Sequence, residues 1–303
     1  MRLNGSWAYK IRKWAIVPFM FIATSAQSME LSPEALKWKS LEYSGSKFFI
    51  SIDTSVSVDI IDKETAIKEF ITPIEGEGKS PTTDDVVKIN VKNSVVGSET
   101  DFTVWVDPDT TVLQRTSIYG GIKEWYRTYR FLNDKVFSDK RKPANSSEKG
   151  NPWHTWTNIG KGFFNLDESE QAVTISESEA LFYLIGVADL SSKGDSVSLN
   201  MYDRSGVINA SVTVIGTKRV LVDYQKLENG QNTRVKKKIN VLEAVVDARS
   251  IKATGNLEKF KFLGYKDDIR LLIDPELKTI IEISGAVEYV GNVTIRLEKI
   301  ALN

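Results

Sequence analysis

The strongest constraint on the fold is a two-residue alternation of apolar and polar side chains along most of the chain. Residues 55–60 alternate strictly, and β-branched and aromatic runs at 87–92, 102–106 and 125–131 continue the pattern. Successive side chains of a strand point to opposite faces, so such runs predict strands with one buried face. Turn-forming residues such as Asp107-Pro108-Asp109 separate the runs. The pattern therefore predicts an all-β, mostly antiparallel fold.

One helix is expected to interrupt the strands near residues 177–190. Ser176 and Glu179 have the spacing of a capping box, in which a hydroxyl and a carboxylate satisfy the first backbone N–H groups. The polar, turn-rich segment 139–152 predicts a long surface loop. We therefore expect two closely packed curved sheets or barrel-like lobes with one central α-helix. The N-terminal β lobe would span 29–150, and the C-terminal β lobe, which carries the helix, 151–303.

The first 28 residues predict a cleavable signal peptide. Lys10, Arg12 and Lys13 form a basic start, residues 14–22 are uncharged and mostly apolar, and the segment 23–28 carries small residues at the positions that a signal peptidase requires. The apolar stretch is shorter than the roughly 20 residues that a membrane-spanning helix needs. A retained anchor is the alternative. The N-terminus thus indicates export.

Composition narrows the classes of partner and site. Lys plus Arg and Asp plus Glu each number 40, so the formal net charge is zero. A balanced charge creates no long-range field that would attract a polyanion, which weighs against nucleic-acid binding. Cysteine is absent, which excludes disulfides, thiol catalysis, thiolate zinc sites and a lipidated cysteine. The fold must therefore be held by its core.

No catalytic or cofactor motif is visible. His154 is the single histidine, which excludes multi-histidine metal sites, and neither a nucleophile elbow nor a phosphate-binding or dinucleotide-binding loop occurs. The acidic pairs at 84–85, 107/109 and 267–268 lack the spacing of a calcium loop, and aspartates in turns normally accept backbone hydrogen bonds. We therefore expect no enzyme activity, no metal and no cofactor.

The most unusual segment is rich in aromatic residues. Trp153, His154, Trp156 and Asn158 follow the polar loop. Exposed indole rings stack on sugars or line apolar pockets, while an imidazole and an amide offer hydrogen bonds. These four residues are the candidate ligand-binding site. The alternative is that both tryptophans close the end of a β core.

The C-terminal half resembles exported Gram-negative proteins that are grouped only as domains of unknown function. The resemblance rests on the apolar helix segment 179–184, the Ser-rich strand entry 191–206, the strand pair at 210–220, and the closing segments 272–285 and 291–297. It implies an all-β envelope domain with one central helix, located in the periplasm. It brings no catalytic residues.

Two functions from different classes follow. The first is a non-catalytic envelope protein that binds an amphiphilic or glycan ligand, or an envelope-protein partner, because a curved sheet with a helix across its mouth can enclose a cavity. The alternative is a carboxylate-dependent hydrolase of a cell-wall or polysaccharide substrate. It predicts two neighbouring carboxyl groups in a groove, one of them with a raised pKa.

Overall fold

The computed structural model describes residues 31–303 except 48, 96, 122, 204–205, 253–259 and 289. The predicted signal peptide lies outside the described residues. The strands are β1 (Trp38–Lys47), β2 (Ile50–Asp62), β3 (Asp85–Val95), β4 (Ser98–Val106), β5 (Val112–Gly121), β6 (Trp125–Phe131), β7 (Lys135–Lys142), β8 (Asn158–Asn165), β9 (Ile175–Ser176), β10 (Ser196–Asp203), β11 (Gly206–Glu228), β12 (Gln231–Ser250), β13 (Tyr265–Asp274), β14 (Thr279–Val287) and β15 (Gly291–Leu302). The helices are α1 (Lys63–Glu69), α2 (Glu168–Gln171) and α3 (Ala180–Val187), with short 3-10 turns at Pro33–Ala35 and Trp153–Thr155.

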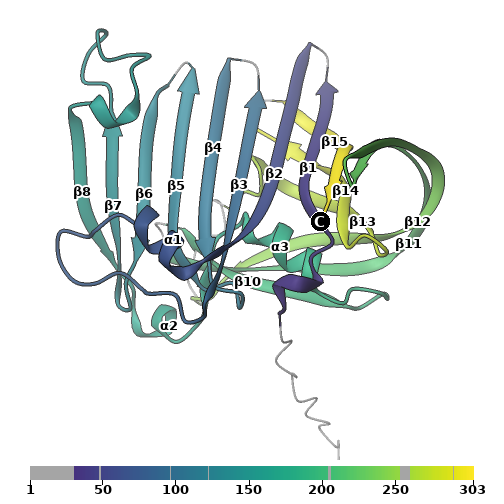
Figure 1. The fold of residues 1–303 in the computed structure, drawn as a ribbon, viewed down its shortest axis with the longest axis horizontal. Coiled ribbons are helices and arrows are strands. Elements are labelled where there is room, and N and C mark those ends of the chain that lie inside the picture. The colour runs from purple at the N-terminus through teal and green to yellow at the C-terminus, as the bar shows by residue number, and fades with distance from the viewer. Residues whose placement is uncertain are drawn as a thin grey trace, which may run out of the picture.

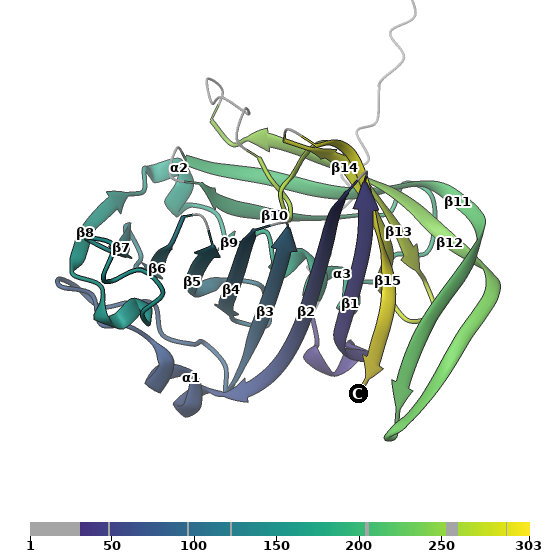
Figure 2. The same ribbon diagram turned by 90° about the horizontal axis from the view of Figure 1, so that it is seen from above.

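The described strands form one continuous sheet in the order β8-β7-β6-β5-β4-β3-β2-β1-β15-β14-β13-β12-β11-β10-β9. Strands β1 to β8 are an antiparallel meander, and β1 pairs with β15 near the other end of the chain. The sheet folds over so that β9 to β11 lie behind β3 to β8 (Figures 1 and 2). The all-β, mostly antiparallel prediction is confirmed, and the two expected lobes are parts of this one sheet.

The long hairpin of β11 and β12 closes part of the sheet on itself. These strands pair from Ile208–Ser250 to Glu228–Gln231, with a bulge near Gly216. The hairpin arches away from the body, as the green strands in Figure 1 show. Residues 225–227 of β11 then pair in parallel with 299–301 of β15. Strands β11 to β15 are thereby joined into a ring, whereas β1 to β8 extend from it as a curved wing.

Helix α3 lies in the core between the two layers of the folded sheet. All eight of its residues are buried, and all except Gly186 belong to the large apolar cluster that joins both halves of the chain. A helix that is apolar on every side is stable only when it is enclosed in this way. The helix begins later than expected, at Ala180, because Ser176 pairs with Met201 as part of β9, and it ends earlier, at Val187. The expected capping box at Ser176 and Glu179 is wrong, since Glu179 makes no side-chain cap.

Helix α1 covers the opposite, outer face of the sheet. Asp62 caps it by accepting a hydrogen bond from the Thr65 N–H. Its one buried residue, Ala66, packs in a small separate cluster with Trp105 and Leu113. The outer face therefore has its own small core, and the side toward β9, β10 and α3 is the inner face.

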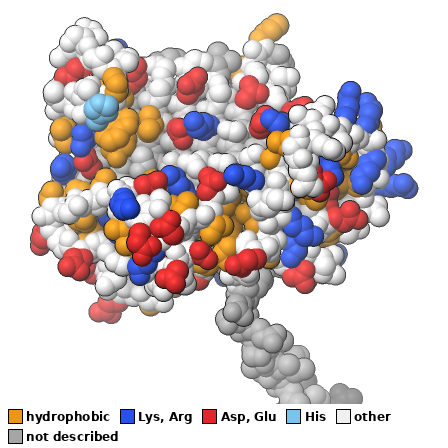
Figure 3. Space-filling model, in the orientation of Figure 1, with side chains coloured by type: hydrophobic (Ala, Val, Ile, Leu, Met, Phe, Trp, Pro, Cys, Tyr) orange, Lys and Arg blue, Asp and Glu red, His pale blue; other side chains and the backbone are white. Residues whose placement is uncertain are grey.

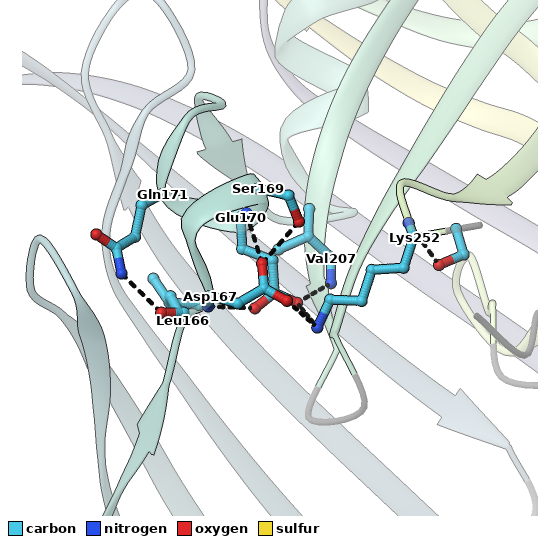
Figure 4. Close-up of polar contacts among 8 residues, drawn as sticks. Leu166, Asp167, Ser169, Glu170, Gln171, Val207 and Lys252 are labelled. Carbon is cyan, nitrogen blue, oxygen red and sulfur yellow. Dashed lines mark hydrogen bonds and ion pairs between the residues drawn. The ribbon is translucent and has the colours of Figure 1, made fainter. Parts of the chain in front are cut away.

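Asp167, Glu170 and Lys252 form a polar cluster, here called the latch, that connects α2 to the ends of β11 and β12. Asp167 and Glu170 form a true capping box, and Glu170 Oε1 also accepts a hydrogen bond from the Val207 N–H. The Lys252 ammonium lies 2.8 Å from both carboxylates (Figure 4). The Glu170 side chain is only 3% exposed, and Lys252 supplies a positive charge beside its carboxylate.

In the part of the chain that the structure describes, no helix is long and apolar enough to cross a membrane. The expected domain boundary at residue 150 lies in the loop between β7 and β8, which are paired neighbours. One apolar cluster includes Val136 from before that boundary and Leu166 from after it. The division into 29–150 and 151–303 stays a prediction.

Candidate functional site

Strands β5 to β8 present an unusual set of polar and aromatic side chains on the inner face of the sheet. In the antiparallel register Tyr119 lies opposite Trp125, and Arg127 opposite Lys140. Directly opposed residues project from the same face of a sheet. Guanidinium and ammonium groups thus occupy positions where most strands of this protein carry apolar residues.

The inner face has a covered lower part and a more exposed upper part, in the orientation of Figure 1. In the lower part, the Tyr129 ring packs edge-on against Tyr202 of β10, with centroids 5.5 Å apart. Toward the loop ends of β6 to β8 exposure increases: Trp125 and Lys140 are half-buried, and Lys142 is exposed. We call this upper region the inner cationic face, which comprises Tyr119, Trp125, Arg127, Lys140, Lys142 and Asn158.

The covered part contains a charged triad of the half-buried Arg115 and the buried Glu177 and Glu179. Arg115 Nη2 donates a 3.0 Å hydrogen bond to Glu179 Oε1, and Arg115 Nε lies 3.4 Å from Glu177 Oε2. Both glutamate side chains are 5% exposed. One oxygen of each carboxyl group, Glu177 Oε1 and Glu179 Oε2, has no hydrogen-bond partner among the described residues.

The triad holds more acidic groups than its single cation balances. Burial alone would lower the pKa of Arg115, but Glu179 and Glu177 outweigh it and raise that pKa above its ordinary value. Burial raises the pKa of Glu177 to about 8, with Arg115 opposing and Glu179 adding to the shift. One guanidinium neutralises one carboxylate, and Glu179 makes the hydrogen bond. Glu177 is therefore the group that holds a proton near neutral pH.

A small hollow of about 140 Å³ adjoins the triad. Arg115, Glu177, Tyr202 and Phe260 line it. The Tyr202 hydroxyl is buried and has no hydrogen-bond partner in the described structure, and burial raises the pKa of this phenol. The hollow is polar and has room for water or a small polar group.

The inner cationic face combines an aromatic pair with positive charge. The Tyr119 and Trp125 rings stack with centroids 3.8 Å apart at 18°. Arg127 Cζ lies 5.3 Å from the Trp125 ring centroid and Lys140 Nζ lies 5.9 Å from it. Both cations thus approach the same indole, in the range of cation–π contacts.

The sequence-predicted site residues divide between the two faces of the sheet. The loop between β7 and β8 brings Trp153, His154 and Trp156 together on the outer side, where Trp153 stacks on Tyr126 at 3.8 Å and 5°. The pale-blue histidine in Figure 3 lies on this exposed surface. Trp156 is buried and donates its Nε1–H to the Glu148 carbonyl, so it holds the loop together.

The fourth predicted residue, Asn158, begins β8 and lies opposite Lys142. It is exposed and belongs to the inner cationic face. The structure therefore does not assemble all four predicted residues around one point.

A separate groove of about 410 Å³ lies under the arch of β11 and β12. Val222, Tyr224 and Leu297 give it an apolar floor, and all three are buried. Charged pairs surround it: Arg234 makes a two-point contact with Asp223. This apolar floor with a charged rim is the arrangement expected of a site for a molecule with apolar and polar parts.

Sequence reasoning missed Arg115, Arg127, Glu177 and Glu179. A signal was present for the arginines: Arg127 lies two residues from both Trp125 and Tyr129, and therefore in phase with the core-facing aromatics. No local pattern connects Arg115 to Glu179, since 64 residues separate them.

Comparisons with known proteins identify a similar solved structure. No protein-family profile matches the chain, and no curated protein matches it. Among solved structures, the chain is similar to a β-barrel-like protein of a domain of unknown function, DUF1849, from Brucella abortus. The similarity has a TM-score of 0.43 at 9% sequence identity and covers 88% of this chain and 99% of that one.

Proposed function

We propose that the protein is a non-catalytic, exported envelope protein of the periplasm that binds a glycan on the inner cationic face. The observation that carries this proposal is the stacked pair of Tyr119 and Trp125 on an incompletely covered sheet face. Aromatic side chains that remain partly exposed beside hydrogen-bonding groups are suited to sugar rings. Asn158 supplies an amide and Arg127 a guanidinium at the same face.

The test compares two tryptophans on opposite faces. Trp125→Ala removes the inner indole, whereas Trp153→Ala removes the indole stacked on Tyr126 on the outer face. Binding of envelope glycans is measured by calorimetry and by ligand-observed NMR. We expect Trp125→Ala to weaken binding about 3- to 10-fold, the range of one aromatic contact, and Trp153→Ala to leave it unchanged. Equal loss in both variants would refute the assignment to the inner face.

The groove under the arch of β11 and β12 supports the alternative that the ligand is amphiphilic. Its apolar floor of Val222, Tyr224 and Leu297 suits an acyl chain, and its charged rim suits a polar headgroup. In this version Leu297→Asp abolishes binding of a fluorescent fatty acid. A variant that binds as well as the native protein would remove this groove from consideration.

The second candidate is the carboxylate-dependent hydrolase, which the Glu177–Glu179 pair favours. One member has a raised pKa, as a general acid requires. However, the hollow beside the triad is only about 140 Å³, and Arg115 contacts both carboxyl groups. Release of reducing ends from cell-wall polysaccharide by the native protein, lost in Glu177→Gln, would establish this activity. The absence of release would leave binding as the function.

A further inference from the structure

Arg127 is a buried cation without a balancing charge. Its residue is 6% exposed, and within the described chain it forms no ion pair. Its Nη1 donates to the Tyr129 hydroxyl at 3.1 Å, and its Nε has no hydrogen-bond partner among the described residues. A buried guanidinium that lacks a carboxylate is unfavourable unless other contacts offset its lost hydration, and the Tyr129 hydroxyl and the Trp125 ring offset that loss only in part.

Further positive charge lies beside Arg127. Lys140 is directly opposite it on β7, and Lys142 follows two residues later on the same face. Burial, together with the charges of Arg127 and Lys142, lowers the pKa of Lys140. Like charges directly opposed across strands are unfavourable.

The nearby acidic groups are committed elsewhere. Asp139 lies on the outer face, where it pairs with Arg141 and Lys161. Glu177 and Glu179 contact Arg115. Over the described residues, neither Lys140 nor Lys142 forms an ion pair. The positive charge of the inner cationic face therefore remains available to an anion from outside the chain.

Space is available next to these cations. On β8, Gly160 lies opposite Lys140 and Gly162 lies opposite Ser138. A Cβ atom built at either glycine meets no described heavy atom within 4 Å. Lys140 and the exposed Lys142 thus border open space on the same face as the stacked rings, and Arg127 lies directly opposite Lys140.

We propose that the inner cationic face is a phosphate-binding site, in which Arg127, Lys140 and Lys142 bind a phosphate monoester of the ligand while Trp125 contacts the group that carries it. The phosphate site extends the proposed function, and it rests on that function only for the part of the ligand that contacts Trp125. A guanidinium matches the geometry of phosphate oxygens in a two-point contact. Ammonium groups add charge without demanding one orientation. The dianion relieves the mutual repulsion of the cations, so binding also stabilises the fold.

The experiment titrates the native protein with inorganic phosphate, N-acetylglucosamine, N-acetylglucosamine 1-phosphate and dihexanoyl phosphatidic acid. Calorimetry measures affinity, and thermal unfolding measures stabilisation. We expect N-acetylglucosamine 1-phosphate to bind at least 10-fold more tightly than the uncharged sugar, and inorganic phosphate to compete with it. Tighter binding of the sugar phosphate than of the phosphatidic acid assigns the phosphate to a glycan, and the reverse order assigns it to a lipid headgroup.

Arg127→Gln and Lys140→Gln are the test variants, and Arg141→Gln, which changes the outer face of the same strand, is the matched control. Both test variants should lose the advantage of the phosphorylated sugar, and the control should keep it. Lys140→Gln decides the result if Arg127→Gln does not fold. Equal affinity for the sugar and its phosphate, or unchanged phosphate affinity in the folded test variants, would overturn the phosphate site. If the uncharged sugar still bound in a Trp125-dependent way, the proposed function would remain supported. If phosphate bound but the uncharged sugar did not, only the phosphate site would be supported.

Discussion

The raised pKa of Glu177 links the buried triad to the stability of the whole protein. The carboxyl group has an ordinary pKa of 4.5 and a folded-state pKa of about 8. At pH values between these two, the folded state holds a proton that the unfolded state has released. The contribution of Glu177 to the free energy of unfolding is therefore greatest below about pH 4.5 and falls as the pH rises toward 8.

The magnitude follows from the two pKa values. Each pH unit inside this window costs about 1.4 kcal/mol of stability. Between about pH 5.5 and pH 7.5 the contribution of Glu177 therefore decreases by about 2 to 3 kcal/mol. This is a large part of the stability of an ordinary domain, which is about 5 to 15 kcal/mol.

The perturbation that isolates this effect is Glu177→Gln, which keeps the shape of the protonated side chain and removes its titration. Urea unfolding at a series of pH values gives the free energy of unfolding of the native protein and of the variant. We expect the difference between them to change by about 2 to 3 kcal/mol from about pH 5.5 to pH 7.5, with the variant gaining as the pH rises. Titrations of other groups cancel in the difference.

Glu64→Gln serves as the control, because Glu64 is exposed at the start of α1. Its unfolding curve should follow that of the native protein at every pH. Parallel curves for Glu177→Gln and the native protein would refute the conclusion that Glu177 holds a proton when the protein is folded.

The remaining predictions concern stability. Gly45→Ala should destabilise the protein by about 1 to 3 kcal/mol, because a Cβ there collides with the Thr294 carbonyl oxygen of the paired strand. Gly120→Ala, where a Cβ meets no described atom within 4 Å, should cost little, and equal urea midpoints for the two variants would contradict this reasoning. Lys252→Met should cost about 1 to 3 kcal/mol because it leaves the buried Glu170 carboxylate without its cation. The exposed pair Lys299–Glu42 supplies the comparison: Lys299→Met should change stability by less than about 1 kcal/mol, and a larger loss there than at Lys252 would show that the latch is not stabilising.

Much of the local structure was predictable because it depends on neighbours in the chain. The alternation at 55–60 predicts a strand, and that segment lies within β2. The sequence predicts one helix near residues 177–190, and the structure has α3 over the shorter range 180–187. The helix start was mispredicted because Ser176 finds a strand partner in Met201, and a tertiary contact of this kind overrides a local capping pattern.

The inner face of β5 to β8 shows the limit of such reasoning. Alternation shows that Arg127 shares a face with Trp125 and Tyr129, but not which face is enclosed. The tertiary structure determines which face is enclosed, because β9, β10 and α3 pack over one side of the sheet and α1 packs over the other.

The apolar–polar alternation that most constrains the fold therefore determines where the strands lie and which side chains of a strand share a face. Only the tertiary structure decided that β1 pairs with β15 and that Arg115 meets Glu177 and Glu179. The physical reason is that strand periodicity is a local property of the backbone, whereas sheet closure and charge pairing depend on which distant surfaces exclude water together.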